Sequence, residues 1–197
     1  MIHSFQCSET QALFDGKRVA RFANFETVAL RKLQQLHAAT TLYFLRISPG
    51  NQLEALKPER RGQHSLRIND QWRVCFVWLD GHASLVELVD YHRRRMTMSG
   101  EVSLIHPGDI LAEDWLKPLG LSQYALAKAI DVPPRRINEI VKGLRGSTVN
   151  TALRLGAFFS TDAQSWVKLQ THFDTEAARE LMSDATARIR RFELAST

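Results

Sequence analysis

The sequence predicts an α+β domain, with an antiparallel sheet and helices on one face, followed by an all-α bundle that contains a helix-turn-helix. Three observations support this fold class. In the first half, one amphipathic helix precedes three runs of strand-forming residues that turn residues separate. The second half has helical periodicity almost throughout. Residues 121–146 have the spacing of two short helices joined by a tight turn.

In the first half, residues 1–5 are expected to form a short strand. A helix is expected over residues 23–39, with its apolar side chains on one face and with Arg31 and Lys32 away from that face. Two hairpin turns, Asn69-Asp70 and Asp80-Gly81, separate three predicted strands. The strands are expected at His64–Ile68, Trp72–Trp78 and Ala83–Tyr91.

The helix-turn-helix is predicted from local signals. Ser122 can cap a helix that runs to Ile130. Asp131 stands at the turn, where its side chain tolerates a left-handed backbone better than most. Pro134 suits the first turn of a second helix, and Gly143 is placed to end it. This second helix is expected to bury Ile137, Ile140 and Val141.

The outward face of the second helix is rich in Arg and Asn, the side chains that pair with guanine and adenine edges in the major groove. We therefore expect a DNA-reading surface, although a helical hairpin with a solvated basic face is the alternative. The base-contact candidates are Arg135, Arg136 and Asn138. The remaining DNA-binding candidates are Gln123, Pro134, Lys142 and Arg145, of which Gln123, Lys142 and Arg145 suit phosphate or edge contacts.

Four more helices are expected in the second half, at Pro107–Leu116, Asn150–Phe159, from Asp162 onward, and at Glu176–Phe192. The second is predicted to have a Leu153, Ala157 and Phe158 face, and the last an apolar face of Leu181, Ala185 and Ile189. The third carries three apolar side chains that suit either the core or a dimer interface. These are Trp166, Leu169 and Phe173.

The chain has 197 residues and a net charge of +5. Residues 1–95 hold 14 Lys and Arg against 9 Asp and Glu, whereas residues 96–197 hold 12 of each. The excess therefore lies in the first half and favours a polyanionic partner. No signal peptide or membrane-spanning run is visible, so a cytoplasmic location is expected.

No metal site or disulfide framework is expected from the pattern of cysteines and histidines. Cys7 and Cys75 stand far apart, and Cys75 lies in an apolar run typical of a buried strand. His3, His37 and His82 have no clustered partners in the sequence, so we expect them at the surface. No metal and no cofactor is predicted.

Several sequence motifs resemble the two members of a bacterial HigB–HigA toxin–antitoxin pair, in toxin-first order. In the first half these are RISPGNQLEAL with Lys57 (46–57), GQHSLRI (62–68), QWRVCF (71–76) and VDYH (89–92). In the second half they are IHPGDIL (105–111), residues 121–146 and TALRL (151–155). The resemblance implies a RelE-like toxin domain over residues 1–92, a linker over 93–103 and an Xre-class, HigA-like antitoxin over 104–197.

The resemblance also implies that the toxin is a metal-independent endoribonuclease that cleaves messenger RNA on the ribosome. In this reaction the RNA 2′-OH attacks the adjacent phosphate and the 5′-oxygen leaves, which requires a proton acceptor, a proton donor and cations around the phosphorane. The implied catalytic residues are Lys57, Arg67, Arg73, Asp90, Tyr91 and His92. Some relatives have His where this chain has Glu54, which is either a substitute general base or a solvated acid.

The antitoxin half is expected to bind a palindromic operator as a homodimer and to repress its own promoter. Because both halves share one chain, the toxin is expected to be bound and silenced by the antitoxin. Silencing could occur by covering the active site or by excluding the toxin from the ribosome, and linker cleavage near residues 93–98 could release activity. Two alternatives are a DNA-binding regulator with a catalytically dead, dimerising RelE-like domain, and an RNA-binding module without catalysis.

Overall fold

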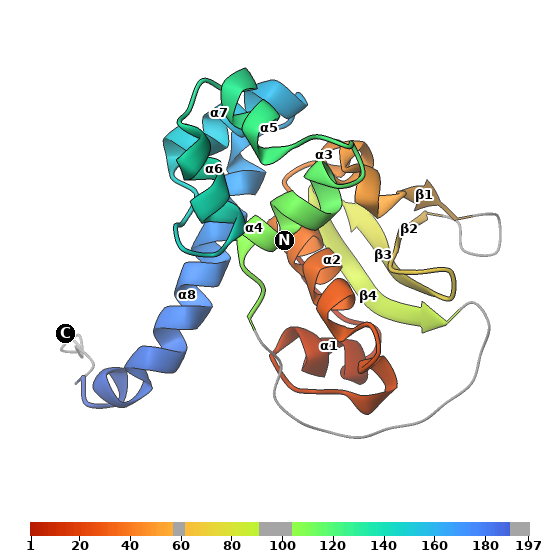
Figure 1. Ribbon diagram of the computed structural model, residues 1–197. Helices are drawn as coiled ribbons and strands as arrows, with labels where there is room; N and C mark the ends of the chain where they lie inside the picture. Colours follow the sequence, from red (N-terminus) through yellow and green to blue (C-terminus); the bar gives the residue numbers. More distant parts are fainter. Residues whose placement is uncertain (57–61, 91–103, 190–197) are drawn as a thin grey trace, which may run out of the picture.

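The computed structural model describes residues 1–56, 62–90 and 104–189 (Figure 1). Within the first half, the strands form one antiparallel sheet in the order β1-β2-β3-β4. The strands are β1 (Glu54–Ala55), β2 (Gln63–Arg67), β3 (Trp72–Leu79) and β4 (His82–Asp90). The helices are α1 (Ser8–Phe14), α2 (Glu26–Ala38) and α3 (Leu42–Ile47), with 3-10 turns η1 (Ala20–Phe22) and η2 (Pro49–Asn51). The predicted α+β class of this half is confirmed.

Both predicted hairpins are present, each for a local reason. In the turn between β2 and β3, the side-chain oxygen of Asn69 accepts hydrogen bonds from the backbone N–H groups of Gln71 and Trp72, at 2.9 and 2.8 Å. In the turn between β3 and β4, Asp80 and Gly81 have φ angles of 50° and 78°. Positive φ at both central residues matches the twist of the flanking strands.

Helices α1 and α2 cover one face of the sheet (Figure 1). Alternate residues of a strand point to opposite faces, and Trp72, Val74 and Phe76 of β3 are buried in the core on the helix side. Arg73 therefore points to the other face. Arg67 on β2 pairs directly with Arg73, so it lies on that same face, turned away from α2.

The expected strand at residues 1–5 is realised only as two isolated parallel bridges to β4. The interruption coincides with Leu85, whose φ of 53° bends β4. The N–H group of Leu85 donates to the Ser4 hydroxyl at 3.0 Å. Because this bond uses a side chain in place of a backbone carbonyl, a regular ladder does not form here.

Helices α1 and α3 were not expected from the sequence, and α2 begins at Glu26 rather than at residue 23. Both unexpected helices are short, 7 and 6 residues, so they contain too few turns for a periodic pattern. In α3, the Thr41 hydroxyl accepts a hydrogen bond from the Phe44 N–H at 3.2 Å, and this cap starts the helix.

The second half is helical, as predicted. Its elements are α4 (Pro107–Ile110), the π-helical η4 (Leu111–Leu116), α5 (Gln123–Ala129), α6 (Pro134–Val141), α7 (Val149–Phe159) and α8 (Ala163–Ala187). Side chains cap four of the helices: His106 caps α4, Ser122 caps α5, Thr148 caps α7 and Asp162 caps α8. The expected helix over residues 107–116 corresponds to α4 continued directly by η4.

The prediction for the buried face of α7 is wrong. The helix turns Ala152, Leu155 and Gly156 inward, whereas Leu153 is 58% exposed and Ala157 and Phe158 are also exposed. Gly156 permits this packing, since a Cβ there would lie 2.9 Å from the carbonyl oxygen of Thr161. The alternative apolar stripe is therefore left on the surface.

The separate helix expected at residues 176–192 is also wrong, because α8 continues without a break to Ala187. No Gly or Pro occurs between residues 163 and 187 to end it. The apolar face predicted for this segment is not buried: Leu181 is 87% exposed, and Ala185 and Ile189 are exposed too. Residues 190–192 of the prediction lie outside the described residues.

The two halves pack through α2, which lies between the sheet and α8 (Figure 1). Helix α2 is thus shared: one side packs on the sheet and the other on the helical half.

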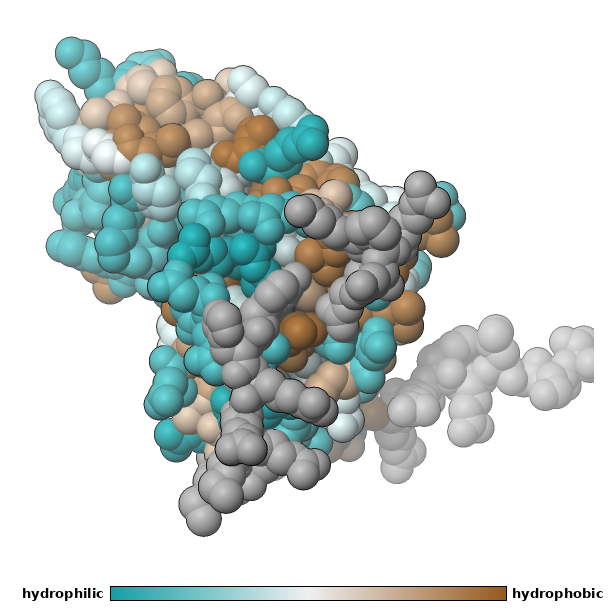
Figure 2. Space-filling view, turned by 90° about the vertical axis from the view of Figure 1, so that its right-hand side faces the viewer, coloured by the Kyte–Doolittle hydropathy of each residue, from teal (hydrophilic) through white to brown (hydrophobic). Residues whose placement is uncertain are grey.

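The space-filling view of the side that carries β1 shows hydrophobic side chains gathered on the upper, helical part of the molecule (Figure 2).

Candidate functional sites

The first candidate site lies on the sheet face turned away from α2. Arg73 donates from one guanidinium nitrogen to the Glu54 carboxylate at 2.8 Å and to the Ser65 hydroxyl at 3.2 Å. Strand pairing explains the cluster, because Glu54 stands opposite Ser65. The Arg73 and Glu54 side chains are 20% and 57% exposed, so a solute can reach both.

Arg67 extends this surface beside Arg73. It donates to the Gln52 side-chain oxygen at 2.8 Å and forms an ion pair with Asp70. Gln52 has φ of 43°, which turns the chain between η2 and β1 toward Arg67. Two guanidinium groups predicted from the sequence are therefore brought together on one accessible face.

Asp90 does not join this cluster. It is the strand partner of Trp72, so the alternation places it on the opposite face from Arg73. Its carboxylate accepts a hydrogen bond from the Gln71 side chain at 3.0 Å. The remaining predicted catalytic residues, Lys57, Tyr91 and His92, lie outside the described residues.

The second candidate site is the helix-turn-helix, whose predicted core is present. Leu126 and Ala127 of α5 are buried against Ile137 and Ile140 of α6, while Val141 is only partly buried. Helix α4 approaches α6 so closely that a Cβ at Gly108 would lie 1.9 Å from the Ile140 carbonyl oxygen. Only glycine fits at this crossing, which the sequence pattern did not indicate.

The turn between α5 and α6 has the expected left-handed residue, since Asp131 has φ of 54°. Arg154 of α7 donates to the carbonyl oxygens of Ile130 and Asp131, at 2.7 and 3.0 Å, and so fixes the turn. Gly143 has φ of 68° and ends α6 as predicted.

The predicted DNA-binding side chains project from α5, α6 and the segment after α6. Asn138 donates to the Gln123 side-chain oxygen at 3.0 Å, which joins the two helices. Glu139 accepts from Arg135 at 2.6 Å and from Arg145 at 2.8 Å. The hydrogen bond from Arg135 is the main cause of a lowered pKa of Glu139.

The other three DNA-binding candidates, Pro134, Arg136 and Lys142, lie in α6 or at its C-terminal end. Pro134 occupies the first turn, and both Pro134 and Lys142 are exposed, while Arg136 is partly exposed. A short, exposed and basic helix of this kind can present side chains to a nucleic-acid groove. The structure therefore keeps all seven sequence-predicted side chains on or next to the motif.

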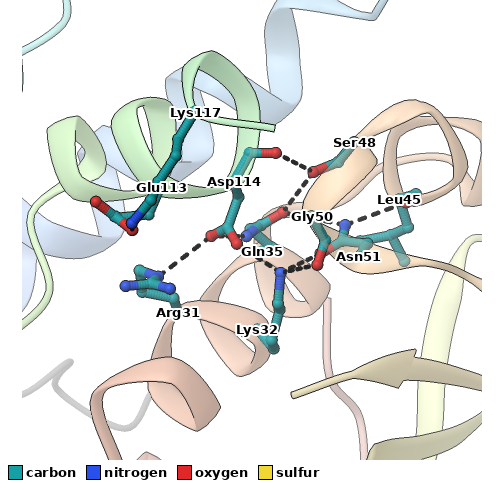
Figure 3. A network of polar contacts seen from close by, with 10 residues as sticks. All are labelled: Arg31, Lys32, Gln35, Leu45, Ser48, Gly50, Asn51, Glu113, Asp114 and Lys117. Atoms are coloured by element: carbon teal, nitrogen blue, oxygen red, sulfur yellow. Dashed lines mark hydrogen bonds and ion pairs between the residues drawn. The ribbon is translucent and has the colours of Figure 1, made fainter. Parts of the chain in front are cut away.

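The third site, which sequence reasoning missed, joins the halves (Figure 3). Asp114 of η4 is 2% exposed, and its two carboxylate oxygens contact Lys32 at 2.5 Å and Gln35 at 2.7 Å. Arg31 lies 3.3 Å from the same carboxylate. Lys32 and Arg31 are indeed away from the apolar face of α2, but they point into the other half.

Lys32 is only 1% exposed, which is rare for a lysine. Burial lowers its pKa, and the adjacent Asp114 carboxylate opposes that shift. Within α2 the sequence offered no signal for this role, because a polar residue outside the apolar stripe is normally solvated. Only the approach of η4 makes the position an interior one.

Aromatic side chains surround this polar contact. Trp115, next to Asp114, packs with its ring centroid 5.7 Å from that of Phe44 and 5.1 Å from that of Trp166. Ser165 also accepts a hydrogen bond from the Thr40 N–H at 3.1 Å. Trp166 and Leu169 are thus core residues between the halves, and Phe173 packs on His106 with a centroid distance of 4.7 Å.

The expectation that His3, His37 and His82 have no partners is wrong, and of the three only His3 is exposed, as predicted. The His3 and His82 rings stack with centroids 3.9 Å apart. His37 packs against His172 of α8 at 5.2 Å and accepts from the Ile2 N–H at 3.4 Å. Burial, then the charges of His172, the N-terminus and Lys168, lower the pKa of His37 to about 4.

Within the described ranges, no group of three or more His, Cys, Asp or Glu side chains is arranged to hold a metal ion. No disulfide joins Cys7 and Cys75, both of which are described, and Cys75 is buried as predicted. Across the same ranges, none of the helices has the length and apolar character needed to span a bilayer.

Comparison with protein families matches each half. Residues 10–92 match the family of RelE-like toxins of the type II toxin–antitoxin system HigB, and residues 113–166 match a helix-turn-helix family. Over 71 residues the chain is 41% identical to Toxin HigB-1 of Vibrio cholerae, which covers 36% of this chain and 74% of that protein. Over 80 residues it is 56% identical to Virulence-associated protein I of Dichelobacter nodosus, covering 41% and 74% of the two chains.

Among solved structures, the Pseudomonas aeruginosa antitoxin HigA with the higBA promoter is 34% identical. The match covers 46% of this chain and 100% of that chain, with a TM-score of 0.45. The antitoxin GraA is 35% identical, over 46% of this chain and 99% of that chain, with the same TM-score.

Proposed function

This chain belongs to the HigB–HigA toxin–antitoxin family, with a RelE-like HigB toxin and a helix-turn-helix HigA-like antitoxin in one polypeptide, and on that premise we propose that it is a messenger-RNA endoribonuclease silenced in cis. We assign the toxin to residues 1–92, the linker to 93–103 and the antitoxin to 104–197. In this proposal the antitoxin half also binds operator DNA and represses its own promoter.

The observation that carries the proposal is the buried contact between the halves. Asp114 of the antitoxin half is 2% exposed because it inserts against α2 of the toxin half. Trp115, 1% exposed, packs between Phe44 of α3 and the Phe159 and Trp166 rings of its own half. A surface this well packed, with a buried charge pair at its centre, resembles a specific protein interface more than a loose contact between tethered domains.

The toxin chemistry rests on the sheet face that carries Arg67 and Arg73. The RNA 2′-OH loses its proton to a base and attacks the adjacent phosphate, and the 5′-oxygen leaves with a proton from an acid, which gives a 2′,3′-cyclic phosphate. Negative charge grows on the phosphorane between these steps, and two nearby guanidinium groups would stabilise it. Glu54, paired to Arg73, is available as a proton acceptor. We assign proton transfer and nucleotide orientation to Lys57, His92 and Tyr91, as the family resemblance implies. Asp90, on the other face, is assigned a positioning role only.

We propose that silencing acts by excluding the toxin from the ribosome and not by covering the catalytic face. The antitoxin contacts lie on α2, α3 and η2, whereas Arg73 and Glu54 remain 20% and 57% exposed on the opposite side of the sheet. A toxin that must enter the ribosome with its substrate would be blocked by the added bulk alone.

For the antitoxin half, we propose that two copies bind a palindromic operator, one recognition helix per half-site. Because Trp166 and Leu169 are buried within the chain, the dimer surface has to lie elsewhere. The exposed apolar side chains of α7, Leu153 and Phe158, are our candidates for it. Arg136 and Asn138 are assigned to base edges, and Lys142 to phosphate.

Two experiments test the proposal. Growth and translation are measured after induction of residues 1–92, of the same fragment with Arg73→Ala, and of the full chain, each with its fold checked by circular dichroism. Arrest is expected for the first alone. If folded residues 1–92 cause no arrest, the chain is instead a DNA-binding regulator with an inert RelE-like domain.

DNA binding is measured separately with the full chain and the DNA upstream of its own gene. Arg136→Ala should weaken specific binding by about 1–3 kcal/mol, while Lys142→Ala should weaken all DNA binding and lower the salt dependence. Equal binding of the upstream DNA and of scrambled DNA would contradict autorepression.

A further inference from the structure

We propose that the toxin half carries a preformed carboxylate-binding site, made by α2, α3 and η2, with which it recognises its antitoxin through the single side chain of Asp114. The site holds the halves together without help from the linker. It rests on the proposed function only in that the two halves act as toxin and antitoxin.

The donors of this site converge on one carboxylate. Lys32 reaches one oxygen of Asp114 at 2.5 Å, and the Gln35 amide reaches the other at 2.7 Å. Arg31 lies 3.3 Å from that second oxygen. The Ser48 hydroxyl also donates to the Asp114 backbone carbonyl at 3.4 Å. Both carboxylate oxygens are therefore satisfied, which a buried charge requires.

Residues of the toxin half alone orient these donors. Lys32 also donates to the Gly50 carbonyl at 2.6 Å and to the Asn51 side chain at 3.0 Å. The Asn51 amide in turn donates to the Gln35 side-chain oxygen at 3.1 Å and to the Leu45 carbonyl at 3.1 Å. Because this fixes the Gln35 oxygen, its N–H₂ group points toward Asp114. Figure 3 shows the arrangement around the carboxylate.

Gly50 is independent evidence that the site is shaped for close approach. A Cβ added there would lie 2.9 Å from both the Cα and a carboxylate oxygen of Asp114. The third nearest atom, the Asp114 carbonyl oxygen, would lie 3.1 Å away. The missing side chain thus makes room for the backbone and carboxylate of Asp114.

Glu113 is the internal contrast, since it is adjacent to Asp114 in η4. It points away from the site and pairs with Lys117 within the same element, at 2.9 Å and with 41% of its side chain exposed. The toxin half therefore distinguishes two neighbouring carboxylates by position. A partner that fits this site offers a short-chain carboxylate directly followed by an aromatic side chain.

The test uses the full chain with a protease site inserted after Arg95 and cleaved in the purified protein. The dissociation constant of the two halves is then measured by dilution and by surface plasmon resonance. The cut halves are expected to stay associated one to one well below micromolar concentration. Asp114→Asn and Gly50→Ala are each expected to raise the dissociation constant on the order of 100-fold or more, and Glu113→Gln less than about threefold.

Two variants separate recognition from folding. Gly50→Ala changes no charge, and the three atoms nearest to its added Cβ all belong to Asp114, so it decides the matter if Asp114→Asn fails to fold. The double variant Lys32→Met with Asp114→Leu replaces the pair by apolar groups and should recover part of the affinity lost in each single variant.

The proposal is overturned if the cut wild-type halves separate at micromolar concentration, or if Asp114→Asn and Gly50→Ala bind as Glu113→Gln does. These readouts concern association alone. Tight, Asp114-dependent association with no growth arrest by residues 1–92 would sustain this inference and contradict the proposed function, and the reverse result would do the opposite.

Discussion

Two ion pairs that involve the toxin half, one within it and one with the antitoxin half, have opposite surroundings. Arg73 and Glu54 meet at 2.8 Å on the outer face of the sheet, where water reaches both. Lys32 and Asp114 meet at 2.5 Å between the halves, where each is almost fully buried. An exposed pair contributes little to stability and can exchange its partner for a substrate. A buried pair is costly to break, so it keeps the same partner and stabilises the contact that it makes.

The largest expected effect tests this difference directly. Lys32→Met leaves the Asp114 carboxylate buried without its closest cation and should lower the free energy of unfolding of the intact chain by about 3–5 kcal/mol. The matched Arg73→Met should cost about 1 kcal/mol or less. Urea unfolding of both variants gives the two values. Equal losses would show that burial does not distinguish the pairs.

A second prediction concerns packing around the helix-turn-helix. Gly108→Ala would place a methyl group 1.9 Å from the Ile140 carbonyl oxygen, so α4 or α6 has to shift, at about 2–3 kcal/mol. Thermal unfolding and DNA binding should both deteriorate. Gly120→Ala is the control: it has φ of 62° but open space around it, and should cost about 1 kcal/mol.

The third prediction concerns pH at the contact between α2 and α8. Burial and neighbouring positive groups lower the pKa of His37 from 6.5 to about 4, and burial also lowers that of His172. Below pH 6.5 the unfolded chain takes up these protons first, so stability present above pH 6.5 is lost as the pH falls toward 4.

For His37 the loss should be about 1–2 kcal/mol, allowing for its partial exposure. Urea unfolding at pH 7 and pH 4.5 measures it. In His37→Gln the pH dependence should shrink by that amount, and an unchanged slope would exclude His37 as its source.

The smallest expected effect concerns the exposed pair. Glu54→Gln should change the free energy of unfolding by less than about 1 kcal/mol, because the amide can still accept from Arg73 and the Glu54 side chain is exposed. If Glu54 is the proton acceptor, growth arrest by residues 1–92 should nevertheless weaken. If the Glu54→Gln variant of residues 1–92 stays fully toxic, Glu54 is a solvated surface acid with no role in catalysis.

Much of the fold could be predicted because its signals are local. Turn residues at 69–70 and 80–81 defined the hairpins, and the Ser122 cap, Pro134 and Gly143 defined the helix-turn-helix pair. The candidates on the sheet face were also accessible to sequence reasoning, because Arg67 and Arg73 belong to recognisable motifs. Asp90 was predicted together with them, but strand alternation places it on the other face of the sheet, which its position in the motif did not indicate.

What the sequence by itself determined is the α+β class of the first half, the helical class of the second, both hairpins and the helix-turn-helix, all of which follow from periodicity, turn residues and residue type. Only the tertiary structure decided which polar side chains become interior. Lys32 and Asp114 are 82 residues apart, and neither has a local pattern that marks burial. Likewise, the inward face of α7 was chosen by close packing at Gly156. Contacts between residues far apart in the sequence set the dielectric around a charged side chain. They therefore decide whether it is a solvated surface group or the buried centre of an interface.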